Sequence, residues 1–135
     1  MGLSRKPEWF RKTQNLKDMV EMRKFIKEYR LNTVCEEAAC PNRGECYNKK
    51  TLTVMILGDT CTRNCRFCNV GTKKPDGKVD EDEPYRVAEA LSKLSLDYVV
   101  ITSVTRDDLK DGGAKHFAKT ITEFKKKNPD TVLEV

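Results

Sequence analysis

Short apolar runs alternate with amphipathic stretches through the second half of the chain. Residues 51–57, 97–103 and 131–135 are rich in β-branched and apolar side chains, which predicts three buried strands. Between them, apolar positions recur with a helical period over 84–95 and 114–128. Strand, helix, strand, helix and strand in this order predict right-handed βαβ units around a parallel sheet, the α/β class.

The first fifty residues follow a different pattern. Apolar residues recur at helical spacing over 15–30, which predicts an amphipathic helix. The basic N-terminal arm before it carries Trp9 and Phe10. Basic residues beside aromatic rings occur in some nucleic-acid binders, but a mobile arm that packs one aromatic pair is more common. We therefore divide the chain into residues 1–50, a helix with a cysteine-rich extension, and residues 51–135, the sheet-forming part.

Six cysteines occur in two trios of unlike spacing. The first trio, Cys-x4-Cys-x5-Cys, lies in a segment whose proline and glycine predict a loop with tight turns. The second trio, Cys-x3-Cys-x2-Cys, directly follows the first strand. The two trios are Cys35, Cys40 and Cys46, and Cys61, Cys65 and Cys68.

The number three distinguishes these trios from ordinary metal motifs. A structural zinc usually takes four protein ligands, and a bacterial ferredoxin run also supplies four cysteines. A cubane cluster held by three thiolates leaves one iron free to bind and activate a small molecule. We interpret the second trio as a catalytic iron–sulfur site. For the first trio structural zinc is the alternative, although two trios suit a pair of clusters better than two zinc ions.

Loops that follow parallel strands predict where the chemistry gathers. The carboxyl ends of such strands meet at one edge of the sheet, so we expect the cysteine loop and the loop 104–113 to line one mouth. In that second loop Arg106, Asp107 and Asp108 either shape the mouth or form a loop ion pair, and the sequence leaves both open. We interpret the acids of 80–83 as helix caps and His116 as an ordinary surface or boundary residue.

Size and charge set broader limits. The chain has 135 residues, enough for one domain but about half of a complete parallel barrel. A strand at 131–135 leaves an open sheet edge, so we expect a longer polypeptide or a partner. The 26 basic against 21 acidic residues give a net charge of +5, which suits an acidic partner. Without an apolar span or signal core, we expect a cytoplasmic protein with free thiols.

Three segments together resemble the lipoyl synthase family of the radical S-adenosylmethionine superfamily: residues 33–46, 58–68 and 101–109. The resemblance runs from about residue 8 to the end of the chain. It implies a partial parallel (βα)6 TIM-like barrel, of which this chain supplies two βα units and the start of the third strand, preceded by the N-terminal helix and the cysteine-rich extension.

The resemblance also implies cofactors and their ligands. The second trio would hold a 4Fe-4S cluster whose open iron chelates S-adenosylmethionine, and the first trio an auxiliary 4Fe-4S cluster that is consumed as sulfur donor. Phe67 and Asn69 would contact adenine, and Thr102 and Ser103 would help to seat the methionine part. The implied reaction inserts two sulfur atoms at the sixth and eighth carbons of an octanoyl chain, by radical chemistry that unactivated carbon–hydrogen bonds require.

Partners and one departure follow from the same resemblance. The partners would be octanoylated lipoyl carrier domains and a ferredoxin- or flavodoxin-type electron donor. In the family a serine of an Arg-Ser-Ser motif also holds the auxiliary cluster, whereas none of the four serines here lies in such a motif, so we expect that these residues do not catalyse alone. A non-catalytic iron–sulfur electron carrier or structural metal protein is the alternative function. A nucleic-acid binder is a third, weakened by the scatter of basic among acidic residues.

Overall fold

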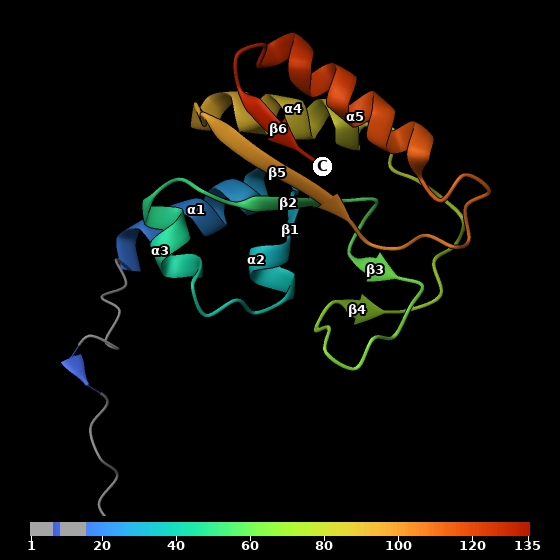
Figure 1. Cartoon of the computed structure of the whole chain (residues 1–135), viewed down its shortest axis with the longest axis horizontal. Coiled ribbons are helices and arrows are strands. Elements are labelled where there is room, and N and C mark those ends of the chain that lie inside the picture. The colour runs from blue at the N-terminus through green and yellow to red at the C-terminus, as the bar shows by residue number, and fades with distance from the viewer. Residues whose placement is uncertain (1–6, 9–15) are drawn as a thin grey trace, which may run out of the picture.

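The computed structural model describes residues 7–8 and 16–135, so Trp9 and Phe10 lie outside the described residues. Figure 1 shows the arrangement of its helices and strands. The helices are α1 (Leu16–Glu28), α2 (Val34–Glu37), α3 (Arg43–Asn48), α4 (Glu83–Leu94) and α5 (Ala114–Lys127). The strands are β1 (Asn32–Thr33), β2 (Thr53–Ile56), β3 (Thr60–Cys61), β4 (Gly71–Thr72), β5 (Tyr98–Ser103) and β6 (Val132–Glu134).

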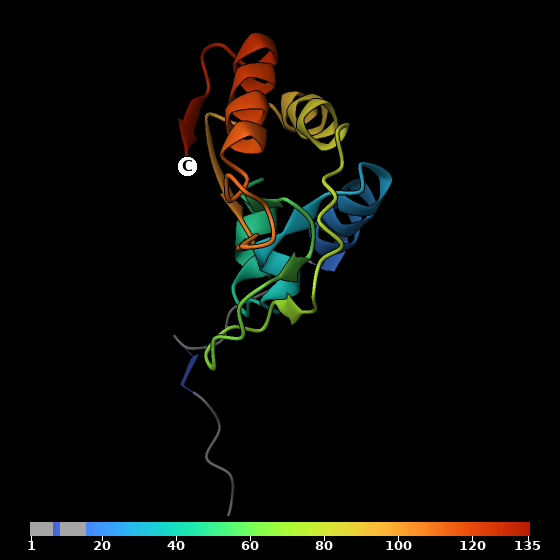
Figure 2. The same ribbon diagram turned by 90° about the vertical axis from the view of Figure 1, so that its right-hand side faces the viewer.

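The main sheet has the strand order β1-β2-β5-β6. Strands β2, β5 and β6 are parallel, which confirms the predicted βαβ order, and α4 and α5 lie side by side on the sheet (Figures 1 and 2). Strand β1, which the sequence pattern did not predict, pairs antiparallel with β2. The described strands form an open, mixed sheet that is compatible with part of a barrel but shows no barrel closure.

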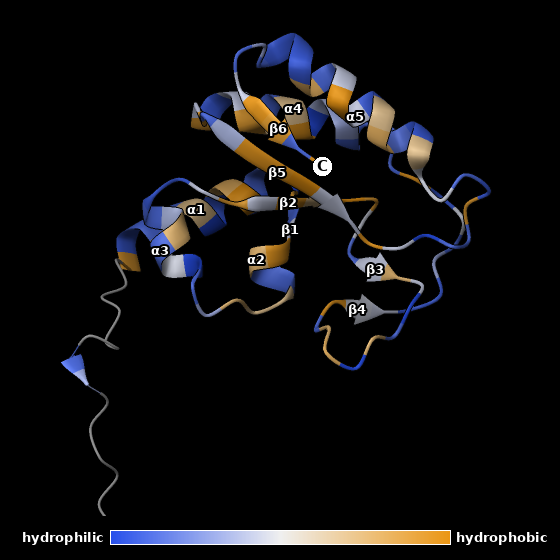
Figure 3. Cartoon of the chain, in the orientation of Figure 1, coloured by the Kyte–Doolittle hydropathy of each residue, from blue (hydrophilic) through white to orange (hydrophobic). Residues whose placement is uncertain are grey.

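The core lies between this sheet and its two crossover helices. Ile56 of β2, Leu91 of α4 and Phe124 of α5 are at most 1% exposed, because each helix turns its apolar stripe toward the strands. Figure 3 shows that the strands of the main sheet are largely hydrophobic, whereas the segment between β4 and α4 is largely hydrophilic. Strand β5 is not buried on both faces as expected for a central parallel strand, since Ile101 is buried but Tyr98 is half exposed.

The N-terminal part consists of short helices rather than loop. Helix α1 confirms the predicted amphipathic helix within two residues at each end. The first cysteine segment, expected to be a loop, forms α2 and α3, which are separated by a turn at Ala39 (φ 49°) and Pro41. None of the helices in the described part of the chain is long and apolar enough to cross a membrane.

The backbone of Leu57 joins the sheet to the rest of the fold. Leu57 directly follows β2 with a left-handed φ of 68°, so the strand cannot continue. Its buried N–H donates to the Glu83 carboxylate at 2.8 Å, and its carbonyl accepts a hydrogen bond from Arg106 at 3.1 Å. Its side chain lies against Gly113 at the start of α5. One residue thus fixes the start of both helices beside the cysteine loop.

Not all of the acids at the start of α4 have the predicted role. Asp82 is the N-cap residue but makes no side-chain capping bond, whereas Glu83 is 4% exposed and lies 2.7 Å from His116 Nε2. His116 is itself only 8% exposed. Glu83 is therefore not a cap and His116 is not a surface or boundary residue, because the two form a buried pair that also satisfies the Leu57 amide. Asp80 does act as predicted, since its carboxylate accepts the Asp82 backbone N–H just before the helix at 3.0 Å.

Replacing Gly113 by alanine should destabilise the protein. Gly113 has a φ of 97°, and a Cβ there would lie 2.3 Å from Leu57 Cδ1 in the core. We expect a loss of about 3 kcal/mol from backbone strain and overpacking together. Gly77→Ala is the matched control, since Gly77 also has a positive φ of 75° but no atom near the added Cβ, and it should cost about 1 kcal/mol. Equal losses in urea unfolding would contradict the close packing at Leu57.

Removing the Glu83 carboxylate should cost much more than removing its exposed neighbour. Glu83→Ala leaves the Leu57 amide and His116 without a buried acceptor, so we expect a loss of about 3 kcal/mol in urea unfolding. Glu81→Ala removes an exposed carboxylate that pairs with Lys119 and should change stability by about 0.5 kcal/mol or less. Similar effects of the two variants would mean that the buried pair does not hold α4 and α5.

Candidate functional site

The second cysteine trio lies on a loop with a closed base. Strand β3, which ends in Cys61, pairs in parallel with β4, so residues 62–70 project as a loop from the carboxyl end of β2 (Figure 1). Cys61 at the base is half-buried, whereas Cys65 and Cys68 are exposed. Phe67 between them is 93% exposed. The fold thus presents two of the three thiols and an aromatic ring to solvent.

The cysteine loop contacts the loop after β5, which confirms the predicted shared mouth. Thr62 donates its backbone N–H to the Thr105 carbonyl at 3.0 Å. The guanidinium of Arg63 forms an ion pair with Asp107 at 3.2 Å. These contacts join segments about forty residues apart, because the carboxyl ends of β2 and β5 lie side by side in the sheet.

The loop after β5 is held by a buried arginine. Arg106 is 5% exposed and bonds both oxygens of Asp108 at 2.8 and 2.9 Å, the Leu57 carbonyl at 3.1 Å and the Lys78 carbonyl at 2.8 Å. Its hydrogen bonds to Asp108 keep the pKa of that carboxyl below its ordinary value. Both alternatives left open by the sequence therefore occur: Arg106 and Asp108 form an ion pair within the loop, and Asp107 helps to shape the mouth.

An open hollow lies beside the cysteine loop. Its walls combine hydroxyl, ammonium and carboxylate groups from the loops after β3, β4 and β5, and it is lined by Thr62, Thr72, Lys73, Lys74, Pro75, Asp107 and Asp108. A second hollow shares its lysine wall and extends to Leu57 and Arg106. This polar mouth has groups that suit a zwitterionic ligand with ammonium and carboxylate ends.

The local structure favours thiolate formation at Cys61. Burial alone would raise the pKa of the Cys61 thiol, but hydrogen bonds from the Arg63 amide, at 3.4 Å, and from Thr105, with the nearby Arg63 charge, outweigh it and lower the pKa. The thiolate is the form that binds metal ions. Three unpaired thiols on one loop, one of them biased to this form, match in number and kind the donors of a three-cysteine cluster site.

The first trio is distributed over α2, the following turn and α3. Its three thiols are half-buried and none forms a disulfide. Burial raises the pKa of Cys35, a hydrogen bond from the Thr53 backbone opposes this, and the charges of Cys46 and Cys40 raise it further. The three side chains are thus close enough to interact electrostatically, and a bound cation would offset their repulsion.

A buried network around Glu36 fixes this first segment. The Glu36 carboxylate accepts a hydrogen bond from the Tyr47 hydroxyl at 2.9 Å and pairs with Arg23 of α1 and Arg43 of α3. Its backbone N–H donates to Thr33, which caps α2. Burial, and then the bond to Glu36, raises the pKa of Tyr47 far above its ordinary value. Sequence reasoning missed Glu36 and Tyr47; their only signal is their position next to Cys35 and Cys46.

Two of the predicted cofactor contacts lie on the cysteine loop and two in the sheet. The side-chain amide of Asn69, directly after Cys68, donates to the Glu37 carbonyl at 3.0 Å. This bond places the loop of the second trio next to the segment of the first. Thr102 and Ser103 lie at the carboxyl end of β5, paired with Met55 and Ile56 of β2.

The sulfurs themselves are not gathered into a metal cage. Among residues 7–8 and 16–135, no three cysteine, histidine or carboxylate side chains converge closely enough to hold a metal ion. The thiols fit a cluster in number and kind, so binding must draw the exposed Cys65 and Cys68 toward Cys61.

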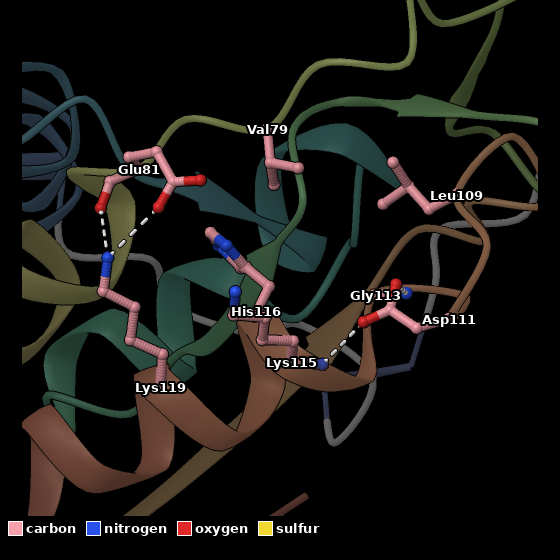
Figure 4. Close-up of a pocket in the computed structure, with 8 residues that line it drawn as sticks. All are labelled: Val79, Glu81, Leu109, Asp111, Gly113, Lys115, His116 and Lys119. Atoms are coloured by element: carbon pink, nitrogen blue, oxygen red, sulfur yellow. Dashed lines mark hydrogen bonds and ion pairs between the residues drawn. The ribbon is translucent and has the colours of Figure 1, made fainter.

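Another pocket lies between the start of α5 and the segment before α4, and His116 is one of the residues that line it (Figure 4). The Lys119 ammonium bonds the carbonyl and carboxylate of Glu81. The Asp111 carboxylate accepts the backbone N–H groups of Gly113 and Lys115, which lowers its pKa. These bonds join the segment before α4 to α5 and fix the start of α5.

Comparison with known families agrees with this geometry. A family model described as Radical SAM superfamily matches residues 55–135, which include the second trio, the end of β2 and everything from β3 to β6. The family implies S-adenosylmethionine, a 4Fe-4S cluster and radical-type enzyme chemistry. Residues 1–54, with the first trio, lie outside the match. With its loop of three thiols at the carboxyl end of β2, the chain belongs to the radical SAM superfamily.

Proposed function

We propose that the chain carries the cluster-binding part of a lipoyl synthase, which inserts two sulfur atoms at the sixth and eighth carbons of a protein-bound octanoyl chain. Cys61, Cys65 and Cys68 would hold the cluster that binds S-adenosylmethionine, and the first trio the auxiliary cluster that gives up its sulfur. When bound, these groups supply one-electron cleavage of the sulfonium and a radical that removes hydrogen atoms from unactivated carbons.

The observation that carries the proposal is the contact between the two cysteine segments. Asn69, next to Cys68, bonds the Glu37 carbonyl, which lies between Cys35 and Cys40. Sulfur insertion needs a sulfur source beside the site where hydrogen is removed, since the carbon radical must react before it is quenched. A single catalytic cluster would need only the second trio, so the adjacent first trio favours a sulfur-inserting enzyme over other radical chemistry.

The chain's own residues would bind and orient in this reaction. Phe67 and Asn69 would lie along the adenine, and Thr102 and Ser103 at the end of β5 would seat the methionine part. The hollow lined by Lys73, Lys74 and Asp107 supplies ammonium and carboxylate groups beside the loop. The resulting complex would work in the reducing cytoplasm, where thiols remain available to metals.

The exposed charge near the loop supports the proposed partners. Arg66, Lys73 and Lys74 are exposed and form no ion pair with another described residue. An acidic protein would be attracted to this face, because complementary potentials speed association. A ferredoxin- or flavodoxin-type electron donor and an octanoylated lipoyl carrier domain are the partners that we propose for it.

Anaerobic reconstitution tests the proposal through iron content and spectrum. We expect about eight irons per chain, four for each trio. Replacing Cys61, Cys65 and Cys68 by alanine should remove about four irons and abolish any change that S-adenosylmethionine makes in the electron paramagnetic resonance spectrum of the reduced protein. The matched variant that lacks Cys35, Cys40 and Cys46 should also lose about four irons but keep that spectral change.

The same experiment separates the alternatives. An electron carrier or structural metal protein would bind iron or zinc without any response of the spectrum to S-adenosylmethionine. Zinc in both trios would reject the proposal as a whole. About four irons, all bound to the second trio, would leave a radical enzyme but reject the auxiliary cluster and with it lipoyl synthesis by these residues.

A further inference from the structure

The segment between Cys61 and Cys65 is held by the Asp107 carboxylate and by the Thr105 carbonyl, which lies 3.0 Å from both the Thr62 backbone nitrogen and Thr62 Oγ1. Asp107 Oδ2 accepts hydrogen bonds from Thr62 Oγ1 at 2.7 Å and from Arg63 Nε at 3.2 Å, and Oδ1 accepts from the Arg63 terminal nitrogen at 3.2 Å. The backbone N–H of Asp107 in turn donates to Thr62 Oγ1 at 3.2 Å. Asp107 thus binds both residues that follow Cys61, through two side chains and in fixed orientation.

Asp107 is presented from a rigid support. Its neighbour Arg106 is buried and bonded to Leu57, Lys78 and Asp108, so the backbone at Asp107 cannot move freely against β2. On the opposite side, the β3–β4 pairing fixes the base of the cysteine loop. Together with the Asn69 bond to the Glu37 carbonyl, these anchors leave only the part between Arg63 and Asn69 to adjust.

The simpler explanation of the Arg63–Asp107 contact is an ion pair that only stabilises the fold, but such a pair would contribute little free energy of unfolding. The Arg63 and Asp107 side chains are both more than half exposed, and such pairs contribute little to folding. The contacts instead determine where Arg63 points. Arg63 lies between Cys61 and Cys65 in the chain, so Asp107 keeps a cation in the segment that joins two proposed cluster ligands.

We propose that Asp107 is a positioning residue for the cluster: it acts through Thr62 and Arg63 to hold the Cys61–Cys65 segment ready for metal binding. This inference rests on the proposed function of the second trio but concerns how tightly that trio retains its cluster. Partners that orient metal ligands typically change metal affinity by about 10- to 100-fold when they are removed.

The test measures how fast the reconstituted protein loses iron to a chelator under anaerobic conditions. Asp107→Ala should lose the iron of the second trio on the order of tenfold faster than the unmodified chain, and Asp107→Asn by an intermediate factor. Asp130→Asn, which removes an exposed carboxylate in the turn before β6, is the matched control and should leave the rate unchanged. The spectral response to S-adenosylmethionine should broaden or weaken in Asp107→Ala.

A second pair of variants, at Thr62, tests the same role in case Asp107→Ala does not fold. Thr62→Ser keeps the hydroxyl and should retain iron normally, whereas Thr62→Val removes it and should lose iron several-fold faster. If the unmodified chain binds no cluster, the proposed function fails. If it binds a cluster, and Asp107→Ala and Thr62→Val retain iron and spectrum unchanged, or Asp130→Asn loses iron equally fast, the positioning role is overturned.

Discussion

The buried backbone N–H and carbonyl of Leu57 are the constraint on which the rest of the structure depends. Where β2 ends, the left-handed backbone of Leu57 removes its N–H and carbonyl from the sheet, and neither can reach water. Glu83 and Arg106 satisfy them. Because these two side chains come from the start of α4 and the loop after β5, satisfying the two backbone groups of one residue fixes the carboxyl edge of the sheet.

Buried and exposed polar interactions at this edge of the sheet have different roles. The buried groups Glu83, His116 and Arg106 are costly to leave unpaired, so they determine one arrangement of helices and loops. The exposed pair of Arg63 and Asp107 contributes little free energy of unfolding but orients the cysteine loop. In one loop, Arg106 thus stabilises the fold, and its neighbour Asp107 orients the cysteine loop.

Much of the frame follows from the sequence, because it depends on local pattern. Periodicity predicts α4, α5 and the three parallel strands, and the rule for strand ends places the loops of Cys61 and Asp107 at one mouth, where they do meet. Strand β1 has two residues and no pattern of its own, so it could not be predicted. The pairing of Glu83 with His116 joins residues 33 positions apart, and neither has a local signal of burial.

Neither the sequence pattern nor the packing of the fold brings the thiols of the proposed cluster site together. The ligands of a cluster are thiolates, which repel one another on a short loop unless a cation lies between them, so the polypeptide alone does not bring the three sulfurs together. Binding of a cation offsets this repulsion, and part of the binding free energy is then used to close the loop. A loop fixed at its base at Cys61 and held again at Asn69, next to Cys68, limits that cost, because fewer residues have to be ordered. The fold thus prepares the position of the site and leaves its closure to the metal.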